Sequence, residues 1–222
     1  MHSTLGRALV GRERVLRNAI ETAIRHGGAR RIVSFPCGPA TELIRWLDQA
    51  RPPDHPVQLL LVDQDEMALE TAHRALSRKL EERPELFERI DLCCLHFTVR
   101  QLIEPKNEQE RRSFTQALGQ ADLLYSAGMF DALPQELARA LVRCLYELVT
   151  PGGTLLVANL HTPPDSAWMM DTILGWHLLV RDQEELLDLA RGLSPAPAKL
   201  NVLKDETEHC LFLSAERPAR SL

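Results

Sequence analysis

The stretch Arg31-Ile32-Val33-Ser34-Phe35-Pro36-Cys37-Gly38-Pro39-Ala40 decides the fold class of this chain. Its first half, Arg31–Phe35, is a short run rich in β-branched residues and predicts a strand. The second half contains small residues and prolines, which predict a tight turn. The apolar spacing after Ala40 predicts a helix. A strand that passes through a small-residue turn into a helix is typical of an α/β domain with parallel strands.

The same unit recurs downstream. Val57–Val62 is apolar except at Gln58, as expected of a strand covered on both faces, and a helix is expected from about Glu66 to Glu82. Further strands are expected at Ile90–Phe97, Asp122–Ser126, Thr154–Leu160, Leu200–Leu203 and Cys210–Ala215, and further helices at residues 12–26, around Phe114–Leu118, after Pro134 and from Asp182 to about Ala190. The order predicts one mostly parallel seven-stranded sheet with helices on both faces and a closing C-terminal antiparallel hairpin.

Composition narrows the class of function. The chain has 222 residues, 45% hydrophobic and 26% charged, which is ordinary for one globular domain. A net charge of −5 without a long basic run argues against a nucleic-acid partner. No apolar stretch is long enough to cross a bilayer, and Met1–Arg14 lacks a signal-peptide core, so we expect a cytoplasmic protein. The sequence leaves the oligomeric state open, a homodimer included.

The five cysteines follow no zinc-binding pattern, and their number is odd. We therefore expect reduced thiols and no metal site. Cys93, Cys94 and Cys144 lie in apolar runs and are expected to be small core residues.

Ligands of open α/β sheets bind beyond the carboxyl ends of the strands, where the strand order reverses. Three turns are expected to meet there. Residues 36–40 could bring backbone N–H groups to a ligand, although an ordinary strand-to-helix turn explains them equally well. Asp63 could accept both hydroxyls of a ribose or cap the following helix. Because Asp65 can provide the cap, we favour ribose binding. Residues 126–131 suit the floor of a site, or form a plain loop.

The order of these segments resembles class I S-adenosylmethionine (SAM) methyltransferases. The resemblance rests on residues 32–42, Leu61-Val62-Asp63-Gln64-Asp65, residues 121–126 and Pro151-Gly152-Gly153-Thr154-Leu155-Leu156-Val157, and it covers about residues 28–215. Residues 125–131, Ala158-Asn159-Leu160 and residues 176–181 are similar to bacterial proteins related to 3-hydroxypalmitic acid methyl ester synthases.

The resemblance implies a Rossmann-like domain at 28–222, a helical cap at 1–27, and SAM as the cofactor. The cofactor-binding residues implied are Phe35, Pro36, Cys37, Gly38, Ala40, Glu42, Asp63, Gln64, Phe97, Thr98, Ser126, Ala127 and Gly128. Pro36 and Ala40 stand where the family usually has glycine. Ser34 stands where many members carry an acid near the methionine amino group, and Glu42 is a candidate to compensate.

The candidate catalytic residues are Tyr125, Asp131 and His161, which follow or end strands at the same edge of the sheet. A lone histidine in a loop is also a common structural residue. The candidate substrate-binding residues are Met129, Asn159, His161, Trp168, Trp176 and Arg181. The tryptophans could line an acyl or aromatic pocket or pack the core. Arg181 could pair with an acceptor carboxylate, or with Glu184 or Glu185.

Three functions remain open on the sequence. The first is methyl transfer from SAM to a small molecule, such as the carboxylate of a hydroxy fatty acid or of a natural product. The second is a nicotinamide-dependent oxidoreductase, which the missing GxGxxG run and the closing hairpin disfavour. The third is a non-catalytic cofactor-binding accessory protein, which the altered glycine turn favours and Asp63 disfavours.

Overall fold

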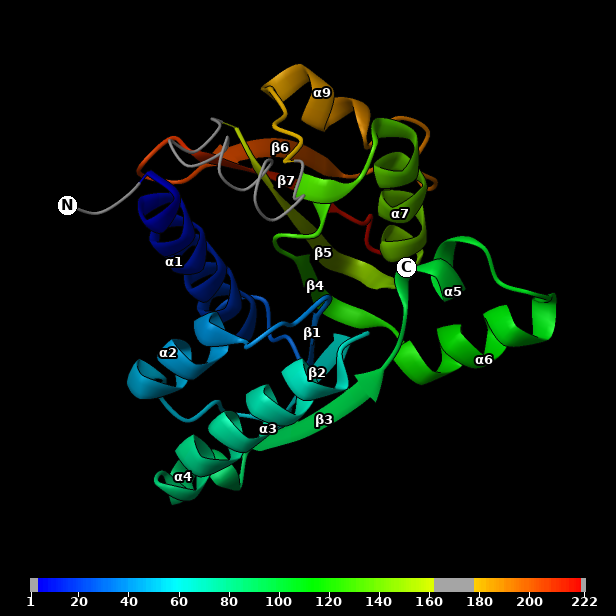
Figure 1. Ribbon diagram of the computed structural model, residues 1–222. Coiled ribbons are helices and arrows are strands. Elements are labelled where there is room, and N and C mark those ends of the chain that lie inside the picture. The colour runs from blue at the N-terminus through cyan, green and yellow to red at the C-terminus, as the bar shows by residue number, and fades with distance from the viewer. Residues whose placement is uncertain (1–3, 162–177, 221–222) are drawn as a thin grey trace.

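A seven-stranded sheet forms the centre of the protein. The computed structural model describes residues 4–161 and 178–220. The strands are β1 (Arg31–Ser34), β2 (Val57–Asp63), β3 (Ile90–His96), β4 (Ala121–Ser126), β5 (Val149–Leu160), β6 (Lys199–Lys204) and β7 (Cys210–Glu216). Their order is β3-β2-β1-β4-β5-β7-β6 (Figure 1). The strands from β3 to β5 are parallel, and β7 is antiparallel to both β5 and β6. The predicted Rossmann-like sheet with a closing hairpin is confirmed.

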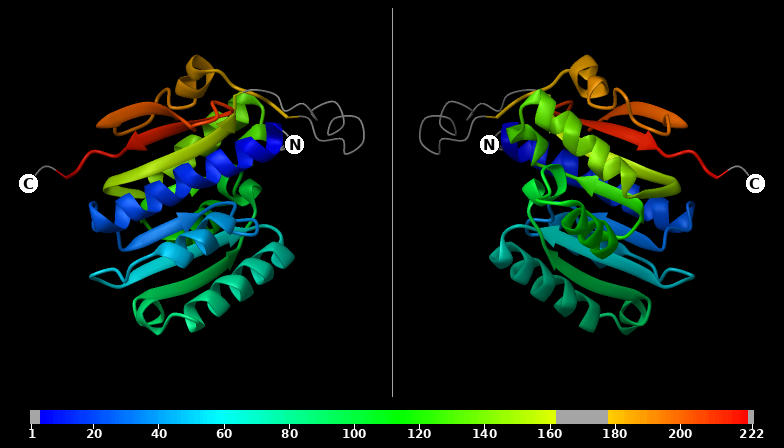
Figure 2. Two further views of the ribbon diagram at one scale, coloured as in Figure 1. Left: turned by 90° about the vertical axis from the view of Figure 1, so that its left-hand side faces the viewer. Right: turned by 90° about the vertical axis from the view of Figure 1, so that its right-hand side faces the viewer.

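Helices cover both faces of this sheet (Figure 2). One face carries α1 (Thr4–Arg25), α2 (Thr41–Gln49) and α3 (Glu66–Glu81), with the short α4 (Pro84–Phe87) after them. The other face carries α5 (Val99–Ile103), α6 (Glu108–Leu118), α7 (Gln135–Glu147) and α9 (Gln183–Asp188), and η1 (Phe130–Ala132) is a single 3₁₀ turn. Each face has its own cluster of buried apolar side chains. The sheet is therefore a rigid layer whose carboxyl-terminal edge holds the strand-to-helix turns in place.

Helix α1 begins eight residues before the predicted start. Leu16, Ile20 and Ile24 are buried against the sheet as expected, and burial of each stabilises the fold by about 1.5–3 kcal/mol. The earlier turns contain Gly6 and Gly11, which have poor helix propensity and hide the helix in the sequence. A Cβ atom at residue 11 would overlap the carboxylate of Asp205, which follows β6. The glycine therefore allows α1 to lie directly on the β6–β7 turn.

Two other boundaries differ from the prediction. The strand expected at Thr154–Leu160 begins earlier, at Val149, because the register between β4 and β5 shifts between Ala121 and Leu123 and takes in the extra residues. Helix α6 begins at Glu108, six residues early, because the Asn107 side chain accepts the Glu110 N–H and caps it.

The cysteines are free thiols, and one was misplaced by the sequence. Cys93 and Cys144 are half-buried, whereas Cys94 is exposed, contrary to the expectation of a core residue. The reason is that β3 is an edge strand whose side chains are only partly covered. No helix of the described ranges is long and apolar enough to cross a membrane.

Candidate functional site

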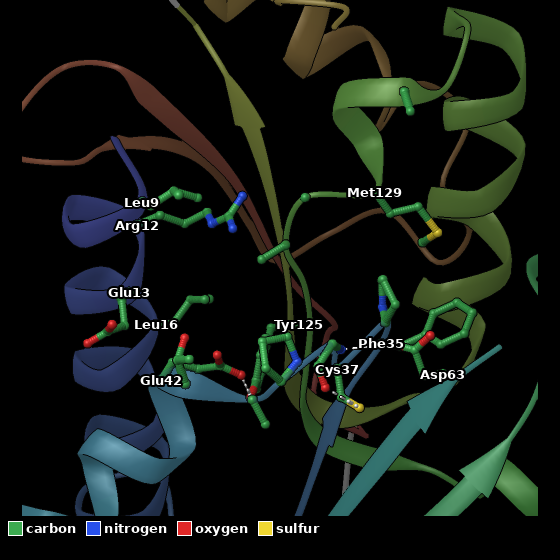
Figure 3. A pocket seen from close by; sticks show the side chains of 18 of the residues that line it. Leu9, Arg12, Glu13, Leu16, Phe35, Cys37, Glu42, Asp63, Tyr125 and Met129 are labelled. Carbon is green, nitrogen blue, oxygen red and sulfur yellow. Dashed lines mark hydrogen bonds between the residues drawn. The ribbon is translucent and has the colours of Figure 1, made fainter. Parts of the chain in front are cut away.

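A cavity of about 900 Å³ lies at the carboxyl ends of β1, β2 and β4 (Figure 3). Helices α1 and α2 form one wall, and the segment after β4 forms the opposite wall. The strand order reverses between β1 and β4, because the chain continues from β1 through β2 and β3 to one edge of the sheet and from β4 through β5 toward the other. The cavity is large enough for a nucleoside cofactor together with part of a second molecule.

The turn after β1 forms the floor of the cavity. Gly38 and Ala40 both have left-handed backbone conformations, with φ of +49° and +50°. An alanine in this region is strained by roughly 1–2 kcal/mol, so the turn tolerates the loss of a glycine at a modest cost. The Cys37 thiol lines the cavity, and burial raises its pKa to about 12, which keeps it protonated.

Asp63 joins this turn to the end of β2. Its Oδ2 accepts the Gly38 N–H at 2.8 Å, and its Oδ1 accepts the Asp65 N–H at 3.1 Å. Asp65 caps α3 by accepting the N–H groups of Met67 and Ala68, as predicted. Each carboxylate oxygen has a further lone pair, so Asp63 can accept additional hydrogen bonds from a ligand in the cavity that it lines.

Aromatic side chains form the wall next to Asp63. Phe35 and Phe97 line the cavity with an edge-to-face contact of 6.2 Å between ring centroids, and Gln64 and Val99 lie beside them. Thr98 does not line the cavity. It caps α5 instead, with its hydroxyl bonded to the Gln101 side chain.

Glu42 and Tyr125 meet at the opposite side of the turn. The Tyr125 hydroxyl donates to Oε1 of Glu42 at 2.7 Å, and both residues line the cavity (Figure 3). Burial raises the pKa of Glu42, against the lowering effect of this bond. Burial and the charge of Glu42 raise the pKa of Tyr125 well above its ordinary value. Tyr125 therefore keeps its proton at neutral pH and donates it to Glu42, and its catalytic role stays a prediction.

The segment after β4, which was predicted to form a floor, supplies the wall opposite α1 and α2. Ala127, Gly128 and Met129 line the cavity, whereas Ser126 is fully buried and does not. Asp131 lies behind this segment, with its Oδ1 accepting the Leu160 N–H at 2.6 Å. Its Oδ2 is 3.9 Å from Nη1 of Arg12, which projects from α1. Asp131 therefore does not line the cavity itself, but it lies next to Arg12, which does.

Arg181 and Asn159 do not reach the cavity. The buried Arg181 guanidinium donates to the Phe130 carbonyl at 2.7 Å, to Asn159 Oδ1 at 2.5 Å and to Gln135 Oε1 at 2.8 Å, and also to the Leu133 carbonyl. Asn159 donates in turn to the carbonyls of Leu160 and Leu179. These contacts do not fit the predicted substrate binding. They instead fix the segment after β4 against the end of β5.

His161 also lies away from the cavity lining. It directly follows β5, as predicted, and its Nδ1 is 3.1 Å from the Arg181 carbonyl oxygen. Trp168 and Trp176 fall outside the described residues. The part of the cavity formed by α1 and α2 was not predicted from the sequence; it consists of Leu9, Val10, Arg12, Glu13, Leu16 and Arg45. The charged residues Arg12 and Glu13 were the signal in the sequence that this helix faces a polar cavity.

Asp131 gives a prediction about stability. Burial raises its pKa to about 6 from an ordinary 3.8, against the lowering effects of the Leu160 N–H and Arg12. Protonated Asp131 thus favours the folded state below about pH 4, and this contribution is lost as the pH rises through about 6. Asp131→Asn is expected to gain stability relative to the wild type as the pH rises from 4 to 7, by up to about 3 kcal/mol. Urea unfolding across that range measures it, and a difference that does not change with pH would contradict it.

At the level of sequence, the chain matches no protein-family model and no curated protein. Its structure is similar to a possible exported protein from Bordetella parapertussis (20% identity, TM-score 0.65, covering 94% of this chain and 67% of that one). It is also similar to magnesium protoporphyrin IX methyltransferase from Synechocystis PCC 6803 with bound SAH (13%, 0.62, 94% and 84%). A third similar structure is the N-methyltransferase NodS from Bradyrhizobium japonicum WM9 (12%, 0.54, 93% and 96%). At these identities the likeness establishes the fold, which is the Rossmann-like fold of SAM-dependent methyltransferases.

Proposed function

We propose that this protein transfers a methyl group from SAM to a small-molecule acceptor. The observation that carries the proposal is the position of Asp63, which lines a large cavity at the strand-order reversal and is held there by the amide of Gly38. Solved structures of this fold include methyltransferases with bound SAM or SAH. The antiparallel β7 between β5 and β6 disfavours a dinucleotide enzyme, whose sheet has the order 3-2-1-4-5-6.

The residues of the cavity suit the three parts of this cofactor. Asp63 can accept the two ribose hydroxyls, and Phe35, Phe97 and Val99 provide an apolar surface for the adenine. Glu42 is 8% exposed and belongs to no ion pair within 4.0 Å among the described residues. A buried carboxylate at a cavity wall is costly without a cation, so Glu42 suits the cofactor's ammonium group.

We propose that the acceptor atom belongs to a carboxylate, as in a hydroxy fatty acid or a natural product. When bound, the cofactor supplies a methyl group that is already activated. The described residues that line the cavity include no histidine or lysine, and Tyr125 and Cys37 hold their protons. A carboxylate needs no general base, whereas an amine or a hydroxyl would. The chain's task is then to align the acceptor and exclude water.

Helix α1 contributes to that task as a cap. Its later turns are fixed in the core, while its earlier turns, with Leu9, Val10 and Arg12, cover the cavity. We therefore propose that residues 1–27 close the site over the domain at 28–222, in a cytoplasmic enzyme.

Calorimetric titration with SAM, SAH and NADH tests the cofactor. We expect binding of SAM and SAH in the micromolar range and no measurable binding of NADH. Transfer of radiolabel from SAM to 3-hydroxydodecanoic acid, compared with the corresponding 1,3-diol, tests the acceptor. Absence of SAM and SAH binding, or a preference for NADH, would refute the methyltransferase. Tight SAM binding without transfer to any acceptor would instead favour the non-catalytic accessory protein.

A further inference from the structure

Arg12 is placed differently from the other arginine of the cavity. It projects from α1 into the space between Leu9, Leu16 and Met129 (Figure 3). Arg45 also lines the cavity, but it forms an ion pair of 3.2 Å with Glu13. Arg12 approaches its carboxylate partner, Asp131, only at 3.9 Å. This distance is too long for a hydrogen bond, so the Arg12 guanidinium is held near Asp131 without being tightly bound to it.

Asp131, the carboxylate nearest to Arg12, already accepts a buried hydrogen bond. Asp131 Oδ1 accepts the Leu160 N–H at 2.6 Å, and the Asp131 side chain is 5% exposed. Asp131 therefore cannot move toward Arg12 without giving up a buried hydrogen bond. Arg12, with 21% of its side chain exposed, keeps access to the cavity. An arginine presents five N–H donors in a planar fork that matches a carboxylate in two-bond geometry.

We infer that Arg12 is the residue of this site that binds a ligand carboxylate. The inference rests on the proposed function, which provides two sources of that group: the amino-acid end of the cofactor and the acceptor. Arg12 takes the role that the sequence suggested for Arg181, whose donors are used within the protein. Asp131 then serves as the resting partner of Arg12 when no carboxylate is bound.

Binding of an acceptor carboxylate by Arg12 would also discriminate between substrate and product. One carboxylate oxygen can accept hydrogen bonds from the guanidinium while the other would form the new C–O bond, as the methyl–sulfur bond of SAM breaks and SAH leaves as a neutral thioether. Methylation converts the anion into a neutral ester, which loses the charge-assisted part of the bond. The product is then held less tightly than the substrate, and Arg12 returns to Asp131.

Three ligands measured by calorimetry test the inference. They are SAH, 5′-methylthioadenosine, which lacks the amino-acid end, and 3-hydroxydodecanoic acid added in the presence of SAH. Arg12→Gln is expected to lower the affinity for a carboxylate-bearing ligand by about 10- to 100-fold, as for the loss of a hydrogen bond to a charged group. Binding of 5′-methylthioadenosine should stay within about twofold of the wild type, because that ligand has no carboxylate. Arg12→Lys should recover part of the loss.

The pattern across the ligands identifies the source of the carboxylate. A loss confined to SAH assigns the cofactor carboxylate, and a loss confined to the fatty acid assigns the acceptor. Arg14→Gln is the matched control, because Arg14 lies on the same helix, does not line the cavity and forms a surface ion pair with Glu206; it should leave both affinities unchanged. Unchanged affinity of Arg12→Gln for SAH, with an unchanged or absent response to the fatty acid, overturns the inference. Equal weakening of 5′-methylthioadenosine also overturns it. Failure of the wild type to bind SAH and 5′-methylthioadenosine would refute the proposed function itself.

Discussion

Asp63→Ala is expected to lower the affinity for SAM and SAH by about 100-fold or more. Each hydrogen bond to a carboxylate contributes about 1.5–3 kcal/mol, and the two ribose hydroxyls would lose both partners. The substitution also frees the Gly38 N–H, which Asp63 now accepts at 2.8 Å. The turn that forms the floor is therefore loosened as well. Calorimetric titration with SAH measures the loss, and the melting temperature shows that the variant is folded.

Asp65→Ala is the matched control, because it removes a carboxylate two residues away on the same segment. Asp65 caps α3 through the N–H groups of Met67 and Ala68 and does not line the cavity. Its loss should cost about 1 kcal/mol of stability and leave SAH affinity within about twofold. Equal loss of affinity in both variants would mean that the substitutions act by disturbing the backbone of this segment, and not by removing hydrogen bonds between Asp63 and the ligand.

Arg181→Met is expected to destabilise the fold by about 3–5 kcal/mol, as when one partner of a buried charged network is removed. The guanidinium satisfies the carbonyls of Phe130 and Leu133 and the side chains of Asn159 and Gln135. Methionine fills a similar volume but donates no hydrogen bond, so the buried Oδ1 of Asn159 loses this donor and three further acceptors each lose one donor. Urea unfolding at pH 7 measures the change.

Arg191→Met provides the comparison for Arg181→Met. The Arg191 side chain is 80% exposed, and its ion pair with Asp188 lies at the surface. Exposed pairs of this kind contribute about 0–1 kcal/mol, so this variant should unfold close to the wild type. A similar loss in both variants would show that methionine itself, and not the buried network, is responsible.

The fold was predictable because its signals are local. The strands β1, β2 and β4 appear in the sequence as apolar runs that end in small or acidic residues, and Asp182 with Glu185 marks the start of α9. The early turns of α1 were not predictable. Their two glycines conceal the helix, and the reason for Gly11 is a contact with Asp205, nearly two hundred positions away.

The site was predictable where it lies on the sheet. Asp63, Gly38 and Phe97 follow strands directly, so the strand ends fix their positions. Arg12 was missed because its approach to the cavity depends on how α1 crosses the sheet, and the sequence does not show that angle. Arg181 was misjudged for the related reason that a charged residue beside a strand end can face either the ligand or the backbone. Two of the acceptors that hold Arg181 are backbone carbonyl groups. Every residue has such a group, so the sequence does not mark these partners.

The close contact between Gly11 and Asp205 bears on the order in which the protein becomes active during synthesis. Helix α1 is synthesised before the sheet, but the carboxylate against which it lies is held by the Cys210 N–H and by Thr207, which follow β6 in the sequence. The cavity wall that α1 supplies cannot be set until the hairpin has formed. We therefore expect nascent chains to remain unable to bind SAM until β7 has been synthesised, however early the central strands pair.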